Sequence, residues 1–153
     1  MSDQQNRPML IAIDPGMSGA IVYETFDSDK VATIKMPSTI RDLADELQHF
    51  KSYPDIFVWV ERVGTYMPGN SGPAAVKFAR HCGHIEMALT TLHIPFDYIT
   101  PSKWMKAVLM TVPKEKKDRK NAIKEKMQRL YPAIKVTLWN ADAMGILHWA
   151  ISK

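Results

Sequence analysis

The feature that most constrains the fold is an apolar run near the N-terminus that ends on a single carboxylate. Residues 9–13 are apolar, Asp14 follows, and a turn containing Pro-Gly leads into a second β-leaning run at 20–26. An isoleucine-rich run bounded by turn residues predicts a buried strand, and the turn predicts a hairpin. Gly16 and Gly19 permit a tight turn and the close approach of a bulky anion. Two interpretations of Asp14 stay open here: a residue that opens a turn, or a metal ligand.

The remaining pattern predicts one α/β domain over residues 1–153, with 1–7 as a loose tail. Apolar periodicity and the Gly and Pro positions place strands at about 8–14, 19–26, 31–36, 56–60 and 96–100, and helices at roughly 38–50, 74–92, 101–109, 115–130 and 139–151. Ser38 is the expected cap of the first helix. The order β-β-β-α-β-α-β-α-α-α is typical of a mixed sheet with helices packed on its faces.

Composition narrows the class of protein. The chain has 153 residues, of which 46% are hydrophobic and 24% charged, as in a globular domain with a real core. No apolar run approaches the twenty residues of a membrane span, and the polar start does not resemble a signal peptide. A single cysteine, Cys82, excludes an internal disulfide and a cysteine-built zinc site. We therefore expect a cytoplasmic protein without a membrane partner, and the net charge of +4 favours a polyanionic partner.

Three carboxylates are expected to converge at one end of the sheet. The runs 9–14 and 56–60 are each closed by an acid, Asp14 and Glu61, and parallel neighbours would bring both to the edge where open α/β sheets bind ligands. Asp142 lies early on the last helix among small residues that allow close packing. Three converging carboxylates are costly without a cation. Such oxygen-rich sites suit Mg²⁺ or Mn²⁺, and a pair of these ions suits in-line attack of water on a phosphodiester.

An ordered set of motifs then supports a resemblance. The motifs are Ile11–Ala20 with its Asp-Pro-Gly, Val60-Glu61, Thr100–Lys106, Lys117–Lys120 and Ala141–Ala143. Together they resemble the RuvC-type Holliday-junction resolvases, most closely their phage and organellar branch, within the ribonuclease H-like fold. The likeness covers nearly the whole chain. It implies a dimeric, metal-dependent endonuclease that makes paired nicks across a four-way DNA junction, in a bacterial or phage-infected cell or an organelle, with Asp14, Glu61 and Asp142 as metal ligands.

The sequence departs from the family pattern at the fourth acid. The family places two acids three or four residues apart on the last helix, but Leu138 and Trp139 occupy those positions here. Asn140 and His148 have the wrong helical offset from Asp142. Glu86 is the remaining candidate: it lies on a mostly apolar face of the long helix and fits the phage-type pattern Gly-His-Ile-Glu. The alternative is a core acid that a hydrogen bond or a lysine satisfies.

Basic residues supply the predicted DNA contacts. Lys106 and Lys120 are the expected active-site lysines, stabilising charge on the phosphoryl group. The lysine-rich segment at 114–129 has two interpretations. It is either a solvated helix face or, beside a phosphodiester-cleaving site, a surface that binds the phosphates of the DNA backbone. The DNA-binding set is Arg62, Tyr66, Met67, Arg80, Lys103, Lys106, Lys114, Lys116, Lys117, Arg119 and Lys120.

Two further segments carry alternatives. The loop at 64–72 is either an ordinary surface loop or a mobile binding loop whose Tyr66 or Met67 wedges against an unstacked base. His81 and His84 are three residues apart, but no third zinc-type ligand is near in sequence, so we interpret them as structural or interface residues. Small residues on the same helix allow close packing, and a two-fold dimer through it would present two active sites to a two-fold junction.

These observations predict a magnesium-dependent endonuclease that resolves branched DNA, with Mn²⁺ able to substitute and two ions per site. One alternative is a nuclease of the same fold acting on flaps, forks or RNA–DNA hybrids. The other is a catalytically weak junction-binding protein that has lost the fourth ligand.

Overall fold

A five-stranded mixed sheet forms the centre of the molecule. The computed structural model describes residues 7–25, 31–64, 69 and 71–153, and these contain β1 (Met9–Asp14), β2 (Ala20–Glu24), β3 (Val31–Lys35), β4 (Ile56–Glu61) and β5 (Phe96–Ile99). The strand order is β3-β2-β1-β4-β5. β1 pairs antiparallel with β2 and β2 with β3, whereas β1–β4 and β4–β5 are parallel. The mixed sheet expected from the sequence is confirmed.

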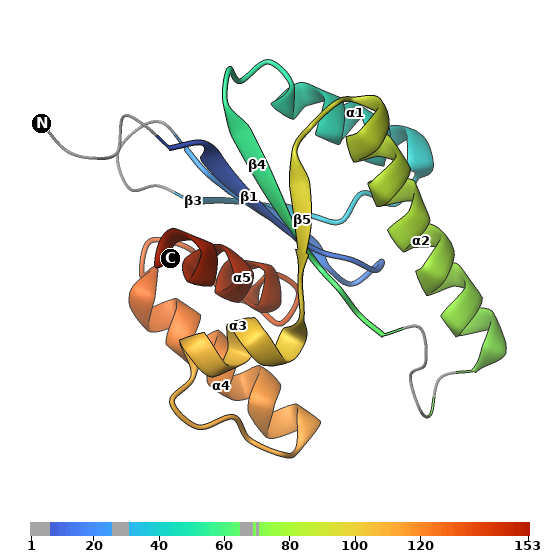
Figure 1. Cartoon of the computed structure of the whole chain (residues 1–153). Helices are drawn as coiled ribbons and strands as arrows, with labels where there is room; N and C mark the ends of the chain where they lie inside the picture. The colour runs from blue at the N-terminus through green and yellow to red at the C-terminus, as the bar shows by residue number, and fades with distance from the viewer. Residues whose placement is uncertain (1–6, 26–30, 65–68, 70) are drawn as a thin grey trace, which may run out of the picture.

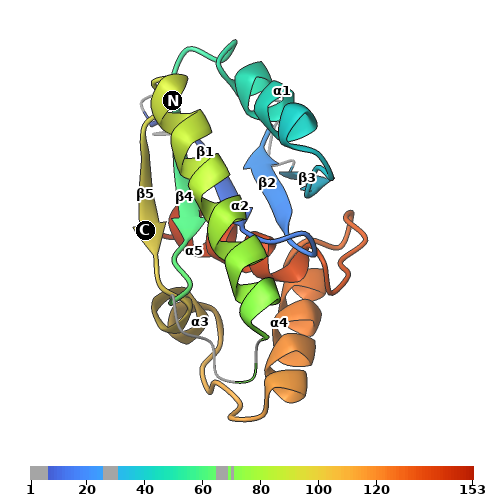
Figure 2. The ribbon, with the colours of Figure 1, turned by 90° about the vertical axis from the view of Figure 1, so that its right-hand side faces the viewer.

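Helices cover both faces of this sheet (Figures 1 and 2). α1 (Ile40–Phe50) and α2 (Gly72–Thr91) pack on one face. α3 (Pro101–Val108), α4 (Lys116–Leu130) and α5 (Ala141–Ile151) pack on the other, with α5 lying directly against β1 and β2. The result is a three-layer α/β arrangement with β1 in the middle. None of the described helices is long and apolar enough to cross a membrane.

The alternation of side chains along β1 decides which face its terminal acid belongs to. Leu10 and Ala12 are buried in the core beneath α3, α4 and α5, whereas Ile11 and Ile13 are buried in the core beneath α1 and α2. Successive side chains in a strand point to opposite faces. Asp14 therefore shares the α5 face with Leu10 and Ala12. The same alternation in β4 puts Glu61 on that face, together with Phe57 and Trp59.

The turn between β1 and β2 depends on two glycines. Gly16 has φ +108°, in the region that side-chain-bearing residues rarely adopt. Gly19 donates to the Gly16 carbonyl at 3.0 Å, and a Cβ on Gly19 would collide with the Asp14 backbone oxygen. The turn can therefore fold back sharply only because both positions lack a side chain, and this fixes the backbone around Asp14.

The element boundaries agree with the predicted ones to within a few residues, and one cap differs. Thr39, not Ser38, caps α1: its Oγ1 accepts from the Asp42 N–H at 3.0 Å and donates to Oδ2 of Asp42 at 2.7 Å. The prediction of Ser38 is wrong because the helix begins one residue later than expected. The end of the run predicted at 20–26 and most of the N-terminal tail lie outside the described residues.

Candidate active site

Three carboxylates from distant parts of the chain meet at the carboxyl end of β1 and β4. Asp14 is the last residue of β1, Glu61 the last of β4, and Asp142 the second residue of α5. The side chains of Asp14 and Glu61 share a hydrogen bond, and the charge of Asp142 acts on both. We call these three residues the acid cluster. Their juxtaposition follows from the parallel pairing of β1 with β4 and the close packing of α5 on β1.

Burial dominates the electrostatics of the acid cluster. It raises the pKa of Asp14 well above its usual value, and the charges of Glu61 and Asp142 raise that pKa further. Burial likewise raises the pKa of Glu61, which is only 7% exposed, and the pKa of Asp142. Ionising any of the three carboxyl groups therefore costs free energy, and a nearby cation lowers that cost.

Trp104 positions Glu61, and the sequence analysis gave it no role. Its indole Nε1 donates to Oε1 of Glu61 at 2.9 Å, and this hydrogen bond lowers the pKa of Glu61 against the effect of burial. The ring is fully buried and lies against Gly145 of α5, where an added Cβ would sit 2.5 Å from Cζ3. A buried tryptophan N–H needs an acceptor, which is the signal that the sequence offered. One of the small residues that follow Asp142 on α5, Gly145, thus makes room for the Trp104 ring.

The start of α4 brings positive charge to the acid cluster. Lys120 lowers the pKa of all three carboxyl groups, and Arg119 and Lys116 lower that of Asp142. Arg119 also donates to the backbone oxygens of Pro113 and Lys114, at 3.2 and 2.8 Å, which holds the α3–α4 connection. Lys120 is thus placed where the sequence expected an active-site lysine.

Lys106, the other predicted active-site lysine, is not brought to the acid cluster. It is exposed in the last turn of α3, and it does not contribute to the pKa shift of any of the three carboxyl groups. The difference arises because α3 presents Trp104 to the site, which turns the side chain two residues later toward solvent.

No fourth acidic ligand joins the cluster among the described residues. Glu86 is exposed, and its Oε2 accepts from the Tyr98 hydroxyl at 2.7 Å, so the expectation of a carboxylate on an apolar face is corrected. Asn140 is buried, with Oδ1 accepting from the Thr137 N–H at 2.8 Å and Nδ2 donating to the Lys135 oxygen at 3.2 Å. His148 Nδ1 is 3.0 Å from the Tyr131 hydroxyl. Each of these side chains already has a partner away from the cluster.

The donor chemistry of the acid cluster fits a hard divalent cation. All of its donors are carboxylate oxygens, which Mg²⁺ and Mn²⁺ prefer, and their pKa values are raised first of all by burial, so a bound cation would stabilise their ionised forms. Within residues 7–25, 31–64, 69 and 71–153, no three side chains of Asp, Glu, His or Cys are already grouped as a metal site.

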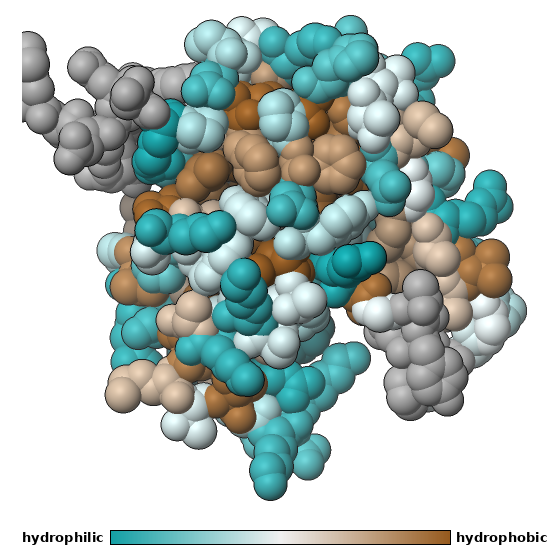
Figure 3. Space-filling view, viewed as in Figure 1, coloured by the Kyte–Doolittle hydropathy of each residue, from teal (hydrophilic) through white to brown (hydrophobic). Residues whose placement is uncertain are grey.

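The remaining predicted DNA contacts are spread over the two faces. Lys116 and Lys117 are exposed at the start of α4, and Lys114 is exposed in the connection just before it. Hydrophilic side chains project from α3 and α4 in the lower part of Figure 3. Lys103 Nζ lies 5.8 Å from the centroid of the Trp149 ring, and the Arg62 guanidinium lies 5.5 Å from the Tyr98 ring centroid. Arg80 is on the α2 side of the sheet. Tyr66 and Met67, the proposed wedge residues, lie outside the described part of the chain.

Comparison with solved structures identifies the fold. Thermus thermophilus RuvC in complex with a Holliday junction substrate superposes with a TM-score of 0.61 at 13% sequence identity, covering 94% of this chain and 92% of that one. A second Thermus thermophilus RuvC structure gives a TM-score of 0.53 at 14% identity, with 92% of each chain covered. No protein-family model matches the sequence, and no curated protein is significantly similar to it. By its three-dimensional structure, the chain has the same fold as RuvC, a form of the ribonuclease H-like fold.

Proposed function

We propose that this protein is a metal-dependent, structure-selective endonuclease that resolves four-way DNA junctions by paired nicks. The observation that carries the proposal is the acid cluster, with the basic start of α4 beside it, on a fold shared with RuvC. A buried oxygen-donor site next to clustered lysines is suited to phosphodiester hydrolysis. The Thermus thermophilus relative was solved with a Holliday junction, which supports branched DNA as the substrate here.

The chain's own residues have distinct roles in this proposal. Asp14, Glu61 and Asp142 would hold Mg²⁺ or Mn²⁺, up to two ions, which when bound would neutralise the carboxylates and supply positive charge to the scissile phosphate. Trp104 keeps Glu61 oriented and favours its ionised form through the 2.9 Å hydrogen bond. Lys120 stabilises negative charge that develops on the phosphoryl oxygens as water attacks. Lys116 and Lys117 hold neighbouring phosphates of the strand.

A dimer through α2 would supply the second nick. The outer face of α2 carries Val76 and Met87, which are 60% and 66% exposed, with the small residues Ala79 and Gly83 between them. Exposed apolar side chains flanking small ones allow two helices to pack closely. A two-fold axis at this face would make the interface self-complementary. It would also relate the two acid clusters by the same two-fold symmetry that relates the two halves of a four-way junction. Sedimentation of the protein and of Gly83→Asp tests this: the parent is expected to be dimeric and the variant monomeric.

Cleavage of a labelled mobile four-way junction tests the proposed function. The parent, Asp14→Asn and the matched control Asp45→Asn, which changes an exposed acid of α1, are compared with Mg²⁺, Mn²⁺ or EDTA. We expect symmetric paired nicks by the parent and the control with either metal, no nicks in EDTA, and junction binding without cleavage by Asp14→Asn.

Two results would contradict the proposal. Tight junction binding without cleavage by the parent in both metals would make the protein a junction binder that lacks the fourth acid. Faster cleavage of flaps, forks or RNA–DNA hybrids than of junctions would assign the same chemistry to another substrate.

A further inference from the structure

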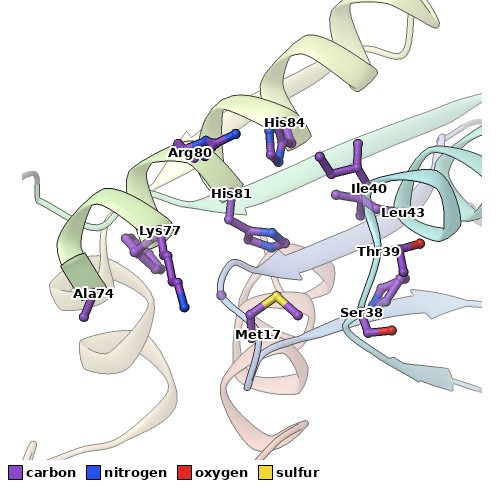
Figure 4. Close-up of a pocket in the computed structure, with 13 residues that line it drawn as sticks. Met17, Ser38, Thr39, Ile40, Leu43, Ala74, Lys77, Arg80, His81 and His84 are labelled. Carbon is purple, nitrogen blue, oxygen red and sulfur yellow. The ribbon is translucent and has the colours of Figure 1, made fainter.

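A pocket of about 620 Å³ lies on the face of the sheet opposite the acid cluster. It is enclosed by the β1–β2 turn, the start of α1 and the first half of α2 (Figure 4). Its size is within the range of small-molecule sites in proteins. We call it the α1/α2 pocket. Gly16 and Met17, which line it, follow Asp14 within three residues, so the pocket and the acid cluster lie on opposite sides of one turn.

His81 presents an unpartnered polar atom to this pocket. The residue is 9% exposed, and its Nε2 is buried with no hydrogen-bond partner among the described residues. The imidazole extends from α2 toward Met17, into the space between the helix and the turn (Figure 4). A buried polar nitrogen without a partner is rare in native proteins and costs free energy. A ligand in the pocket that offers a hydrogen-bonding group would remove that cost.

The polar part of the pocket lining attracts an anion. Lys77, Arg80 and His84 contribute to it, and no carboxylate does. In the part of the chain that the structure describes, neither Lys77 nor Arg80 forms an ion pair. α1, a helix of 11 residues, also begins at the pocket, but Thr39 caps its N-terminus and the Asp42 carboxylate accepts from the Thr39 hydroxyl, so the attraction for an anion comes from Lys77 and Arg80.

The walls of the pocket are apolar. Phe78 lies against the turn, with its ring carbon Cε2 3.4 Å from where a Cβ on Gly16 would be. Met17, Ile40 and Leu43 complete the apolar surface. A ligand that matches both the apolar walls and the cationic side chains has a flat apolar body and an anionic group. A nucleoside phosphate has both. Aromatic and thioether side chains are suited to contact with a base, and cationic ones to its phosphate.

We propose that the α1/α2 pocket binds one unstacked nucleotide, with its base against Phe78 and Met17 and its phosphate toward Lys77 and Arg80. DNA as the source of this nucleotide rests on the proposed function, because a strand passing the acid cluster reaches the pocket around a single turn. A free nucleotide has the same chemistry and is the other source. Branched DNA offers weakly stacked nucleotides at the branch point, for which extrusion is least costly.

The first arm of the test uses free ligands and needs no DNA cleavage. Thymidine 5′-monophosphate and, separately, inorganic phosphate are titrated into the protein while the imidazole resonances are followed by NMR. The chain has five histidines, so the signals are few. We expect the nucleotide to shift the signals of His81 and His84 and to leave those of the exposed His49 and His93 unchanged. Equal shifts with phosphate alone would overturn the base-binding half of the proposal.

The second arm uses a four-way junction that carries 2-aminopurine next to the branch point, in EDTA. We expect the parent to raise the fluorescence of 2-aminopurine, as unstacking does. Ile40→Trp fills the mouth of the pocket from an exposed position, and Gln48→Trp makes the same change at an exposed position of α1 outside it. We expect Ile40→Trp to remove the signal and weaken junction binding about tenfold, and Gln48→Trp to change neither. Arg80→Gln removes a positive charge from the pocket lining, and Arg41→Gln removes one from α1 outside the lining, so these two variants form the corresponding charge comparison.

The two arms together decide the proposal and its source. Nucleotide-dependent shifts at His81 without any effect of Ile40→Trp on the junction would assign the pocket to a free nucleotide. Loss of the 2-aminopurine signal in Ile40→Trp alone would assign it to the DNA strand. Junction cleavage by the parent, with no shifts at His81 and equal behaviour of the two Trp variants, would overturn the pocket proposal and leave the proposed function standing. Failure of the parent to bind junctions would contradict the proposed function, and the first arm would still decide the pocket.

Discussion

The two sides of the β1–β2 turn are chemical opposites. On the α5 side, Asp14 joins two other buried carboxylates, and their pKa values are raised because burial and mutual repulsion disfavour the charged forms. On the α1/α2 side, Gly16 and Met17 face two histidines and two cations, and no acid lines the pocket. The acid cluster therefore attracts cations, whereas the pocket attracts an anion. In the proposed function, metal ions would occupy the first and a phosphate of the bound strand the second.

The acid cluster and the α1/α2 pocket also differ in the elements that form them. The acid cluster is held by regular structure: the ends of two paired strands, a helix packed on them, and the hydrogen bond from Trp104 to Glu61. The α1/α2 pocket is bounded by a turn, a helix start and one flank of α2, and it keeps an unpartnered His81. Sites on rigid elements position reacting groups, whereas cavities at element ends accommodate ligands. We therefore expect substitutions on the acid side to affect reaction rate, and those on the pocket side to affect binding.

Loss of one buried carboxylate is expected to have the largest effect. Asp142→Asn should lower the single-turnover cleavage rate by about a thousandfold or more, because it removes a ligand of the proposed metal site. The same change should raise Tm in EDTA at neutral pH by a few degrees, corresponding to about 1 kcal/mol, since the buried ionised group is gone. Rate assays and calorimetry measure both. A cleavage rate within tenfold of the parent would remove Asp142 from the site.

Substitutions of Lys120 and Lys106 are expected to have the next largest effects on cleavage, and the two should differ. Lys120→Gln is expected to slow cleavage about thirtyfold, because Lys120 acts on all three carboxyl groups and, in the proposed function, would stabilise the charge that develops on the phosphoryl group. Lys106→Gln, on exposed α3 surface, should change the rate less than threefold and weaken junction binding at most slightly. Single-turnover rates at saturating protein separate the two. Equal losses would mean that Lys106 reaches the bound strand.

A glycine distant in sequence should have an intermediate effect. Gly145→Ala places a methyl group against the buried Trp104 ring, so it is expected to cost about 1–3 kcal/mol of stability and to slow cleavage about tenfold through Glu61. Gly72→Ala is the matched control at the start of α2, where a Cβ meets nothing within 4 Å, and it should change stability by less than about 1 kcal/mol. Urea unfolding of both variants measures the difference. Equal stability would show that Trp104 can move aside.

These residues also show what the sequence could and could not predict. Asp14 and Glu61 were predictable because a strand that ends on an acid leaves a local pattern, and parallel pairing brings such ends together. The Trp104–Glu61 bond spans 43 residues and depends on how α3 packs beneath α5, so no local pattern contains it. The α1/α2 pocket joins a turn, a loop and two helices from four parts of the chain. The sequence shows only that His81 and His84 are three residues apart, and it does not show that they line a pocket. Lys106 and Lys120 looked equivalent, and helix orientation alone distinguished them.

Trp104→Phe should produce a smaller effect that depends on pH. The indole donor lowers the pKa of Glu61, so its removal raises that pKa and extends the protonated form to higher pH. The loss in cleavage rate should therefore be greatest at acidic pH, on the order of tenfold, and should shrink as pH rises and Glu61 ionises. A pH–rate profile of parent and variant measures this. A loss that is constant across pH would point to packing instead.

The smallest expected effect is the opposite pH response of the two sides. Raised pKa values make the acid cluster a source of stability that is present below pH 3.8 and is lost as pH rises through the folded pKa. His81 has a lowered pKa, caused by burial and then by His84, so its contribution is present above pH 6.5 and is lost as pH falls through the folded pKa. Lys77, Arg80 and His84 are the other titratable groups that line the pocket, and of these His84 lowers the pKa of His81.

His81→Gln is expected to remove the pocket's share of this response. Between pH 7.5 and 5.5, parent Tm should fall by about 1–3 °C more than that of His81→Gln, and His93→Gln, an exposed change, should follow the parent. Because the raised carboxyl pKa values act in the opposite direction as pH falls, the comparison is made between variants and not from the parent curve alone. Thymidine 5′-monophosphate bound in the pocket would increase the parent's pH sensitivity if it prefers neutral His81, and reverse it if its phosphate prefers the imidazolium. The sign of that change therefore reports which form of His81 the ligand meets.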